Sequence, residues 1–341
     1  MNTAIRRRIV FLSFLGMFFL ALGTVTNSYG AADLGFSLKL GGGVGYLFNG
    51  AGDLEKTRQG YEQYCTDWVE TYYTSDFNWK KQSILPGFGI EAMLKIGDSF
   101  GVGLGTAYLG FTRKGDYALY YDRVLSEWYG TETYANAELI DISYKMSAIP
   151  ISLNFYYFLP MDGMSLYFFA GPSIYFGSLT HDWADDYHNT GELVSWYYWD
   201  EKVDFQQNMT TQEKASCTAF GFQGGIGLEL PLSPMFSLAV EAFGRYAAFS
   251  NWTGTWTDSA TVTRKNWHEL YGWWYTDTAN FSAGGSGTIF SYDYYYSNED
   301  KWYKQMWMDD VAPSGSYIRN VRKASINLNS VAILIHAIIN F

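Results

Sequence analysis

The chain contains little proline, little cysteine and only one long apolar run. Its 341 residues include 7 Pro and 2 Cys, and 17% of them are charged. Two cysteines allow at most one disulfide bond, which is too few to stabilise a fold of this size. The long apolar run lies at the N-terminus, and no other segment approaches the roughly 20 apolar residues of a transmembrane helix. Any membrane span in the rest of the chain must therefore be made of strands.

Basic residues are also scarce. The 23 Lys and Arg stand against 34 Asp and Glu, which gives a net charge of -11. Because phosphate backbones demand a basic surface, we predict no nucleic-acid partner. No motif in the chain predicts a cofactor, so none is expected.

The N-terminal run has the features of a secretory signal. Arg6, Arg7 and Arg8 precede apolar residues from Ile9 to Leu22, and small residues follow around Gly30 to Ala32. This order is typical of a signal peptide. We predict a signal peptide over residues 1–30, cleaved near Gly30 to Ala32, and a single domain over residues 33–341.

Aromatic residues and glycine are abundant. The chain has 29 Tyr, 13 Trp and 35 Gly, and 19% of its residues are aromatic. Its mean hydropathy is only -0.13. Strands with one apolar face, one small or polar face and aromatic girdles produce this combination, as in bacterial outer-membrane proteins.

Eight segments alternate apolar with small or polar residues at the period of a strand. The final segment ends the chain with an apolar face formed by Val331, Ile333, Ile335, Ala337, Ile339 and Phe341. A bulge is expected at Gly171-Pro172. The predicted strands cover about residues 34–48, 88–96, 100–108, 149–157, 165–177, 220–230, 238–246 and 331–341.

Short and long connections alternate between these segments. Three are tight turns, and four are long and polar: Ala51 to Leu85, Lys114 to Glu138, Thr180 to Ser216, and Ser250 to Lys323. We therefore predict an all-β fold, an eight-stranded antiparallel up-and-down transmembrane β-barrel with long extracellular loops and periplasmic termini in the bacterial outer membrane. Strand formers in the third and fourth loops indicate hairpins that continue the wall above the membrane, and ten strands remain an alternative if the fourth loop adds a membrane hairpin.

The strand sequences resemble a known superfamily. The run AIPISLNFYYFLP, the run LYFFAGPSIYFG, the segment FGFQGGIGLELPLSPMFSLAVEAFGRY and the terminal Phe341 are similar to the small outer-membrane β-barrels that include OmpX, the OmpA barrel and OmpW-like porin-family proteins. The resemblance covers the strands and not the loops. It implies the fold more strongly than a function, since family roles range from adhesion and surface protection to small-solute passage.

Charged side chains fall on the inner face of the predicted barrel. An eight-stranded barrel is just wide enough for its own side chains to fill. Buried charges require partners, so a paired polar core is expected, with a gated ion path as the alternative. The predicted lumen residues are Lys39, Glu91, Lys95, Glu229, Glu241 and Arg245.

The third and fourth loops are rich in Tyr and Trp. Exposed aromatic side chains among acids have the composition of binding surfaces, although the same residues also suit packing of the loops upon themselves. Outer-membrane lipid is an expected partner, and an extracellular protein or glycan is a candidate ligand. The candidate binding residues are Trp196, Trp199, Trp273, Trp274, Tyr295 and Trp302.

One catalytic alternative rests on the third loop. Asp186-Tyr187-His188 resembles the Asp-x-His pair of the omptin outer-membrane proteases, and Asp67 and Glu70 of the first loop are candidates for the acids across the cleft. Omptins have ten strands and space their acids differently. We therefore predict no enzyme, with an omptin-like endopeptidase and a narrow small-solute pore as alternatives to a structural or surface-binding protein.

The same loop also has the residue types of a metal site. His181, Asp182, Asp185, Asp186 and His188 match no zinc or EF-hand spacing, so no metal is predicted. Cys65 and Cys217 both fall on the oxidising side of the membrane and form a candidate disulfide.

Overall fold

The structure is a computed structural model that describes residues 34–69, 74–79, 83–127, 130–195, 200–297 and 300–341. The predicted signal peptide lies outside these residues. The strands are β1 (Leu34–Leu47), β2 (Thr74–Trp79), β3 (Ile84–Ile96), β4 (Phe100–Glu127), β5 (Gly130–Met161), β6 (Met164–Ser195), β7 (Glu201–Pro231), β8 (Phe236–Phe249), β9 (Thr253–His268), β10 (Gly272–Tyr296), β11 (Lys301–Asp309), β12 (Ile318–Lys323), β13 (Ile326–Asn327) and β14 (Ser330–Asn340). A 3-10 turn, η1 (Phe48–Ala51), precedes the helix α2 (Asp53–Val69).

Eight of the strands pair in a closed antiparallel ring, which we call the ring. Its order is β1, β3, β4, β5, β6, β7, β8 and β14, and β14 pairs with β1 to close it. All eight predicted strand segments are found in it. The chain end lies against the first strand, where Phe341 N donates to Phe36 O at 2.9 Å.

The ring strands alternate between two faces as their sequences predict. On β14 the odd residues from Val331 to Ala337 point outward and are exposed, whereas Ala332 and His336 point inward and are buried. The bulge expected at Gly171-Pro172 is absent, because the β5–β6 register is the same on both sides of it. Glycine is required there since a Cβ on Gly171 would lie 1.9 Å from Leu153 O.

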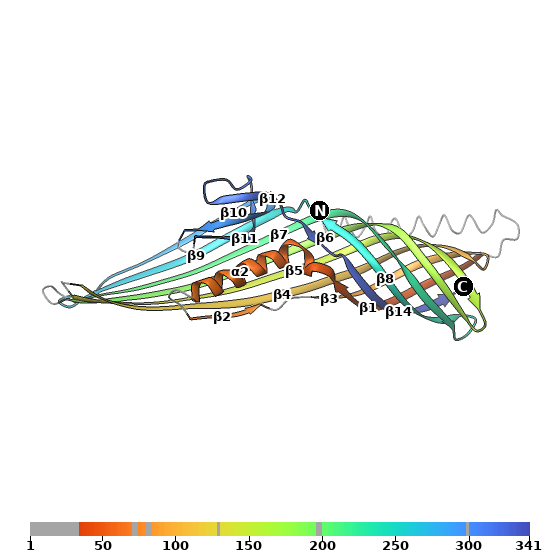
Figure 1. Ribbon diagram of the computed structural model, residues 1–341, viewed down its shortest axis with the longest axis horizontal. Coiled ribbons are helices and arrows are strands. Elements are labelled where there is room, and N and C mark those ends of the chain that lie inside the picture. The colour runs from red at the N-terminus through yellow and green to blue at the C-terminus, as the bar shows by residue number, and fades with distance from the viewer. Residues whose placement is uncertain (1–33, 70–73, 80–82, 128–129, 196–199, 298–299) are drawn as a thin grey trace.

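Four strands continue far beyond the ring. β5 and β6 each have 32 residues, or about 105 Å at ~3.3 Å per residue. The expectation of polar loops at Lys114–Glu138 and Thr180–Ser216 was therefore wrong, since most of both segments is strand. The expectation that a hairpin in the third loop continues the wall is confirmed, because β6 and β7 pair throughout it. We call these outer halves of β4 to β7, together with α2, β2 and β9 to β12, the extension; it tapers to the end opposite the C-terminus (Figure 1).

The two faces exchange polarity at one level of the sheet. Gly110, Ser147, Ser178, Ser216 and Thr253 are aligned neighbours on successive strands, and we call them the boundary row. On the ring side of this row the outward residues are apolar, and on the extension side they are polar. The inward residues change from a mixture of small, aromatic and charged or polar side chains in the ring to a mostly apolar and aromatic set in the extension.

The first and fourth predicted loops are folded onto this sheet. β9 pairs with β7 over Glu201–Ser216, whereas β8 pairs with β7 over Gly221–Pro231, so the fourth loop widens the extension and leaves the ring at eight strands. Helix α2 lies along the extended sheet (Figure 1). Its start is fixed by Gly52, which has a positive φ of 69° and no room for a Cβ beside Ser325 O.

Among the described residues, no helix is long and apolar enough to span a membrane.

Candidate functional site

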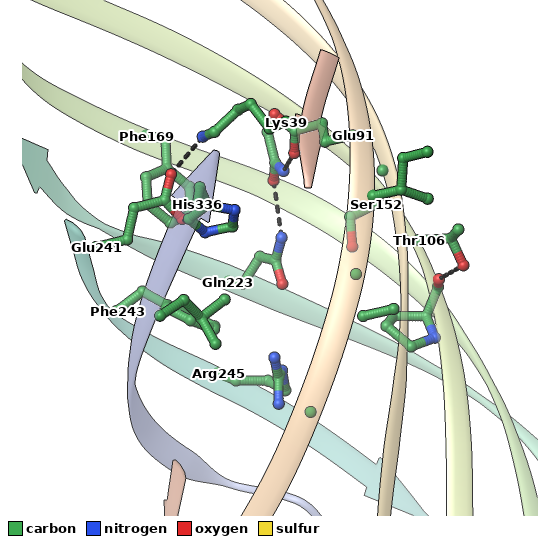
Figure 2. Close-up of a pocket in the computed structure, with 18 of the residues that line it drawn as sticks. Lys39, Glu91, Thr106, Ser152, Phe169, Gln223, Glu241, Phe243, Arg245 and His336 are labelled. Carbon is green, nitrogen blue, oxygen red and sulfur yellow. Dashed lines mark hydrogen bonds and ion pairs between the residues drawn. The ribbon is translucent and has the colours of Figure 1, made fainter. Parts of the chain in front are cut away.

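A network of charged and polar side chains fills the ring (Figure 2). Lys39 from β1 forms an ion pair with Glu241 from β8, and both side chains are at least 95% buried. Lys39 Nζ also donates to Tyr156 Oη at 3.3 Å, and Tyr167 Oη donates to Glu241 Oε1 at 2.7 Å. His336 Nε2 lies 3.0 Å from Glu241 Oε2. Glu241 is therefore contacted by one lysine, one tyrosine and one histidine.

The other predicted interior acids also have partners. Glu91 accepts hydrogen bonds from Tyr156 Oη and from Asn154 Nδ2, and Asn154 Oδ1 accepts one from Gln223 at 3.0 Å. Nearer the end with the tight turns, Lys95 Nζ lies 3.1 Å from Glu229 Oε2.

Arg245, the sixth predicted interior residue, lies at the other end of the network. Its guanidinium group lies 5.1 Å from the centre of the Phe243 ring, a cation–π contact. The structure thus brings all six predicted residues to the interior of the ring, as two ion pairs, one hydrogen-bonded acid and one arginine over an aromatic side chain.

The space left between these side chains is small. A cavity of about 80 Å³ is lined by Lys39, Glu91, Gln223, Arg245 and His336 among others. That volume holds a few water molecules. The side chains otherwise fill the ring, as expected for eight strands.

Sequence reasoning missed His336 as a member of this network. His336 falls at the parity opposite to Val331, Ile333 and Ile335, so strand alternation already placed it on the inner face. Its contact with Glu241 depends on the stagger between β14 and β8, which the sequence does not reveal.

The interior of the extension is aromatic and apolar. A row of ring contacts lies there: Trp79 stacks on Tyr144 at 5.7 Å, Tyr144 stacks on His181 at 4.2 Å, and His181 contacts Trp307 at a tilt with centres 5.2 Å apart. His181 Nδ1 lies 2.9 Å from Glu213 Oε2, and both residues are almost fully buried. This packing belongs to a buried core that also includes Met146 and Leu179, next to the boundary row.

Helix α2 is attached to this interior by charged contacts. Glu55 joins Arg113 of β4 at 3.2 Å and Arg58 of its own helix at 3.0 Å. At the other end of the helix, Asp67 forms an ion pair of 2.6 Å with Lys301 of β11. The helix is therefore held at both ends against the inner face of the extension.

The residues of the protease hypothesis do not converge. Asp186 and His188 lie on the outer face of β6, where His188 Nε2 contacts Asp204 at 2.9 Å. Asp67 lies on α2, at the inner face, where Lys301 and Tyr303 bind it. The sheet separates the two groups. Glu70 lies outside the described residues.

The candidate metal ligands also lie on opposite faces of β6, because side chains alternate along a strand. His181 and Asp185 point inward, and Asp182, Asp186 and His188 point outward. Within the described part of the chain, no group of three His, Cys, Asp or Glu is placed to hold a metal ion.

The candidate disulfide is not formed. Cys65 and Cys217 are both buried and not bonded to each other. Cys65 lies near Glu138. Burial, and to a lesser degree Glu138, raise the pKa of the Cys65 thiol to about 12. Glu138 of β5 pairs with Tyr187 of β6, which pairs with Gln207 of β7. Gln207 is ten residues from Cys217 along β7. Ten residues of strand span about 33 Å, too far for a bridge.

The candidate binding aromatics are split between two places. Trp273 is 55% exposed at the outer end of the β9–β10 hairpin. Tyr295 and Trp302 contact each other at 5.0 Å on the β10–β11 hairpin, with the Arg319 guanidinium 4.0 Å over Trp302. The 22 residues of β10 between Trp273 and Tyr295 span about 70 Å. Trp196 and Trp199 lie outside the described residues, as does the side chain of Trp274.

Comparison with known proteins adds little. No family model matches the chain, and no curated protein matches it. A solved structure, a major outer membrane protein from Thermus thermophilus, aligns with 91% of this chain and 100% of its own length at 14% identity and a TM-score of 0.29. A likeness of that strength carries no assignment.

Proposed function

We propose that this protein is an eight-stranded β-barrel of the bacterial outer membrane, closed to solutes and without enzymatic activity, which serves as a structural or surface-binding protein. The observation that carries the proposal is the exchange of polarity at the boundary row. A sheet whose outer face turns from apolar to polar at one level on successive strands has two different solvents on the two sides of that level.

The apolar belt has the height of a bilayer. On β5 the outward apolar residues run from Ile149 to Leu159, and 9–11 tilted residues are about what a membrane strand needs. A contiguous exposed apolar surface of this size marks a membrane or protein contact. Exposed members of the belt include Leu40, Val44, Phe88, Ile90, Leu153, Phe155, Phe168, Ile174, Phe222, Ile226, Val240, Ile333 and Ile335.

Aromatic side chains edge the belt at both levels. Tyr46, Phe220 and Tyr246 are exposed toward the extension, and Phe100, Phe236 and Phe341 are exposed toward the tight turns. Such girdles anchor membrane barrels at the two interfaces. Because the tight turns and the C-terminus share one end, we assign that end to the periplasm and the extension to the cell exterior.

Two features argue against a pore. The paired network leaves about 80 Å³ inside the ring, and a buried core of apolar and aromatic side chains, which includes Met146 and Leu179 next to the boundary row, continues from the ring into the extension. We therefore expect no stepwise current in planar bilayers. Unitary currents that change in a Glu241→Gln variant would establish the narrow pore instead.

We infer that the protein has no protease activity because the sheet separates Asp67 from Asp186 and His188. We expect no cleavage of a fluorogenic peptide library by the protein refolded with lipopolysaccharide. Cleavage that disappears in both Asp186→Asn and His188→Ala would make the protein a protease.

Cysteine accessibility tests the membrane assignment. In a chain with Cys65→Ala and Cys217→Ala, Leu153→Cys lies on the outer face of β5 within the belt, and Ser143→Cys lies on the same face beyond the boundary row. A charged, membrane-impermeant maleimide applied to intact cells should label Ser143→Cys and spare Leu153→Cys until denaturation. Equal labelling of both positions in the folded protein would refute the assignment.

A further inference from the structure

The extension contains a second cavity, distinct from the interior of the ring. Its volume is about 200 Å³, and it lies between α2, β4, β5, β6, β10 and β11. Most of its lining side chains are half-exposed, so the cavity communicates with solvent. On β5 it is bordered by Glu138, which lies about 30 Å along the strand from Ser147 of the boundary row.

Aromatic rings form most of the walls. Tyr64, Tyr296 and Tyr303 contact one another, with ring centres 4.8 to 5.5 Å apart. Trp183 and Trp307 meet edge to face at 5.8 Å. A second pair, Tyr61 and Tyr117, completes the walls, with ring centres 5.9 Å apart. The faces of such rings carry a negative quadrupole that attracts cations.

A carboxylate without a cationic partner borders the same cavity. Among the described residues, Glu138 forms no hydrogen bond or ion pair. Burial, and to a lesser degree Asp185 on the next strand, raise the pKa of Glu138 to about 7. Asp185 is itself 91% buried, and its Oδ1 has no hydrogen-bond partner among the described residues. Burying an acid without a partner is costly.

The cation that lines the cavity is occupied elsewhere. Lys304 Nζ forms an ion pair of 3.0 Å with Asp293. The cavity is therefore lined by aromatic rings and by a carboxyl group that has no cationic partner among the described residues, and this lining favours a cation over an anion or a neutral sugar. Its volume is below the roughly 300–1,000 Å³ of sites for drug-sized ligands, so the group that fits is small.

We propose that this cavity, which we call the aromatic cavity, binds a small organic cation of the alkylammonium class, with Glu138 as its counter-ion and the Tyr and Trp faces around its alkyl groups. The site belongs to the extension and does not depend on whether the ring lies in a membrane. Asp185 acts on the ligand at longer range, through the negative field that it shares with Glu138.

Calorimetric titration of the whole folded protein in a non-ionic maltoside detergent tests the proposal. The probes are choline, tetramethylammonium and 3,3-dimethyl-1-butanol, the neutral isostere of choline. We expect both cations to bind and the alcohol to bind at least tenfold more weakly. Equal affinity for choline and its neutral isostere, or no binding of either cation by demonstrably folded protein, would overturn the proposal.

Two glutamates of one strand provide a matched pair of variants. Glu138→Gln keeps the shape of the side chain and removes its charge, and it should weaken choline binding at least tenfold. Glu132→Gln makes the same change on the same face of β5, six residues away and outside the cavity, and should leave affinity unchanged. Equal loss in both variants, or in neither, would contradict the role of Glu138. Far-ultraviolet circular dichroism and heat-dependent gel mobility report folding of each variant.

Discussion

The ring and the extension share four strands and have opposite interiors. Along β5 the inward residues Asn154 and Tyr156 are polar or hydrogen-bonded within the ring, whereas Ile140 and Ile142 are apolar within the extension. On the outer face, Leu153 and Phe155 give way to Ser143 and Asp141. One continuous strand thus follows two opposite rules of burial.

The difference shows that strand alternation is set by geometry and that its polarity is set by the surroundings. In water, apolar side chains gain by turning inward. In hydrocarbon that gain disappears, and the interior becomes the place where charged groups find partners. Under the proposed membrane assignment, the boundary row is where one rule replaces the other.

The largest expected effect comes from the pair at the centre of the ring. Lys39→Met would leave the buried Glu241 without its lysine, which typically costs about 3–5 kcal/mol. The matched change in the extension is Lys202→Met, since Lys202 pairs with Glu192 at 2.7 Å with both side chains more than 40% exposed. Exposed pairs contribute about 0–1 kcal/mol. Urea unfolding of both variants in lipid vesicles compares the losses, and similar losses would show that the ring interior is hydrated.

A charge on the outer face distinguishes the two surroundings directly. Leu153→Arg should lower the free energy of unfolding by about 2–4 kcal/mol, the cost of arginine at the midplane of a bilayer. Ser143→Arg, on the same face of the same strand, should change it by less than about 0.5 kcal/mol. If Leu153→Arg were as mild as Ser143→Arg, the apolar belt would not be in lipid.

The sequence predicted the ring better than the extension, and the exchange of polarity is the reason. Apolar residues at alternate positions identified all eight ring strands, because the exposed apolar face gives an unbroken signal. The same alternation continues through Tyr117, Leu119, Ile140 and Ile142, yet the acids and lysines opposite them make the segment polar on average, as in a loop.

Helix α2 and the interior pairs depend on contacts between distant segments. The helix is polar along much of its length and is held by Arg113 and Lys301, which are far away in the sequence. Parity placed Lys39 and Glu241 inside the ring without pairing them, since β14 lies between β1 and β8. The aromatic cavity likewise combines residues of six elements, which no local pattern reveals.

A buried acid in the extension should make stability depend on pH. The pKa of Glu138 rises from 4.5 in the unfolded chain to about 7 in the folded protein, so only the folded protein holds this proton between those values. Stability should therefore fall as pH rises through this window, by on the order of 1–3 kcal/mol. The titratable or charged groups around Glu138 are Tyr61, Tyr64, Cys65, Tyr117, Asp185, Tyr296, Tyr303 and Lys304.

The measurement is urea unfolding at pH 5 and pH 8 for the wild type, Glu138→Gln and Glu132→Gln. Glu138→Gln should lose much of the pH dependence, and Glu132→Gln should retain it. An unchanged pH dependence in Glu138→Gln would assign the titration to another group. Asp185 is the first to examine, because burial and the nearby Asp186 raise its pKa to about 6.

The smallest expected effect on stability is at the exposed tip. Deleting Trp267 to Trp307 would remove Ile289 and Met306 from the core of the extension, so a single substitution is the cleaner test of binding. Trp273→Ala removes a side chain that is 55% exposed and should change the free energy of unfolding by less than about 0.5 kcal/mol. If the tip holds a partner, attachment of cells to a protein or glycan array should fall severalfold. Trp302→Ala, at the half-buried Tyr295–Trp302 pair of the β10–β11 hairpin, is the control for position. Equal attachment by both variants and the wild type would leave the extension a structural element.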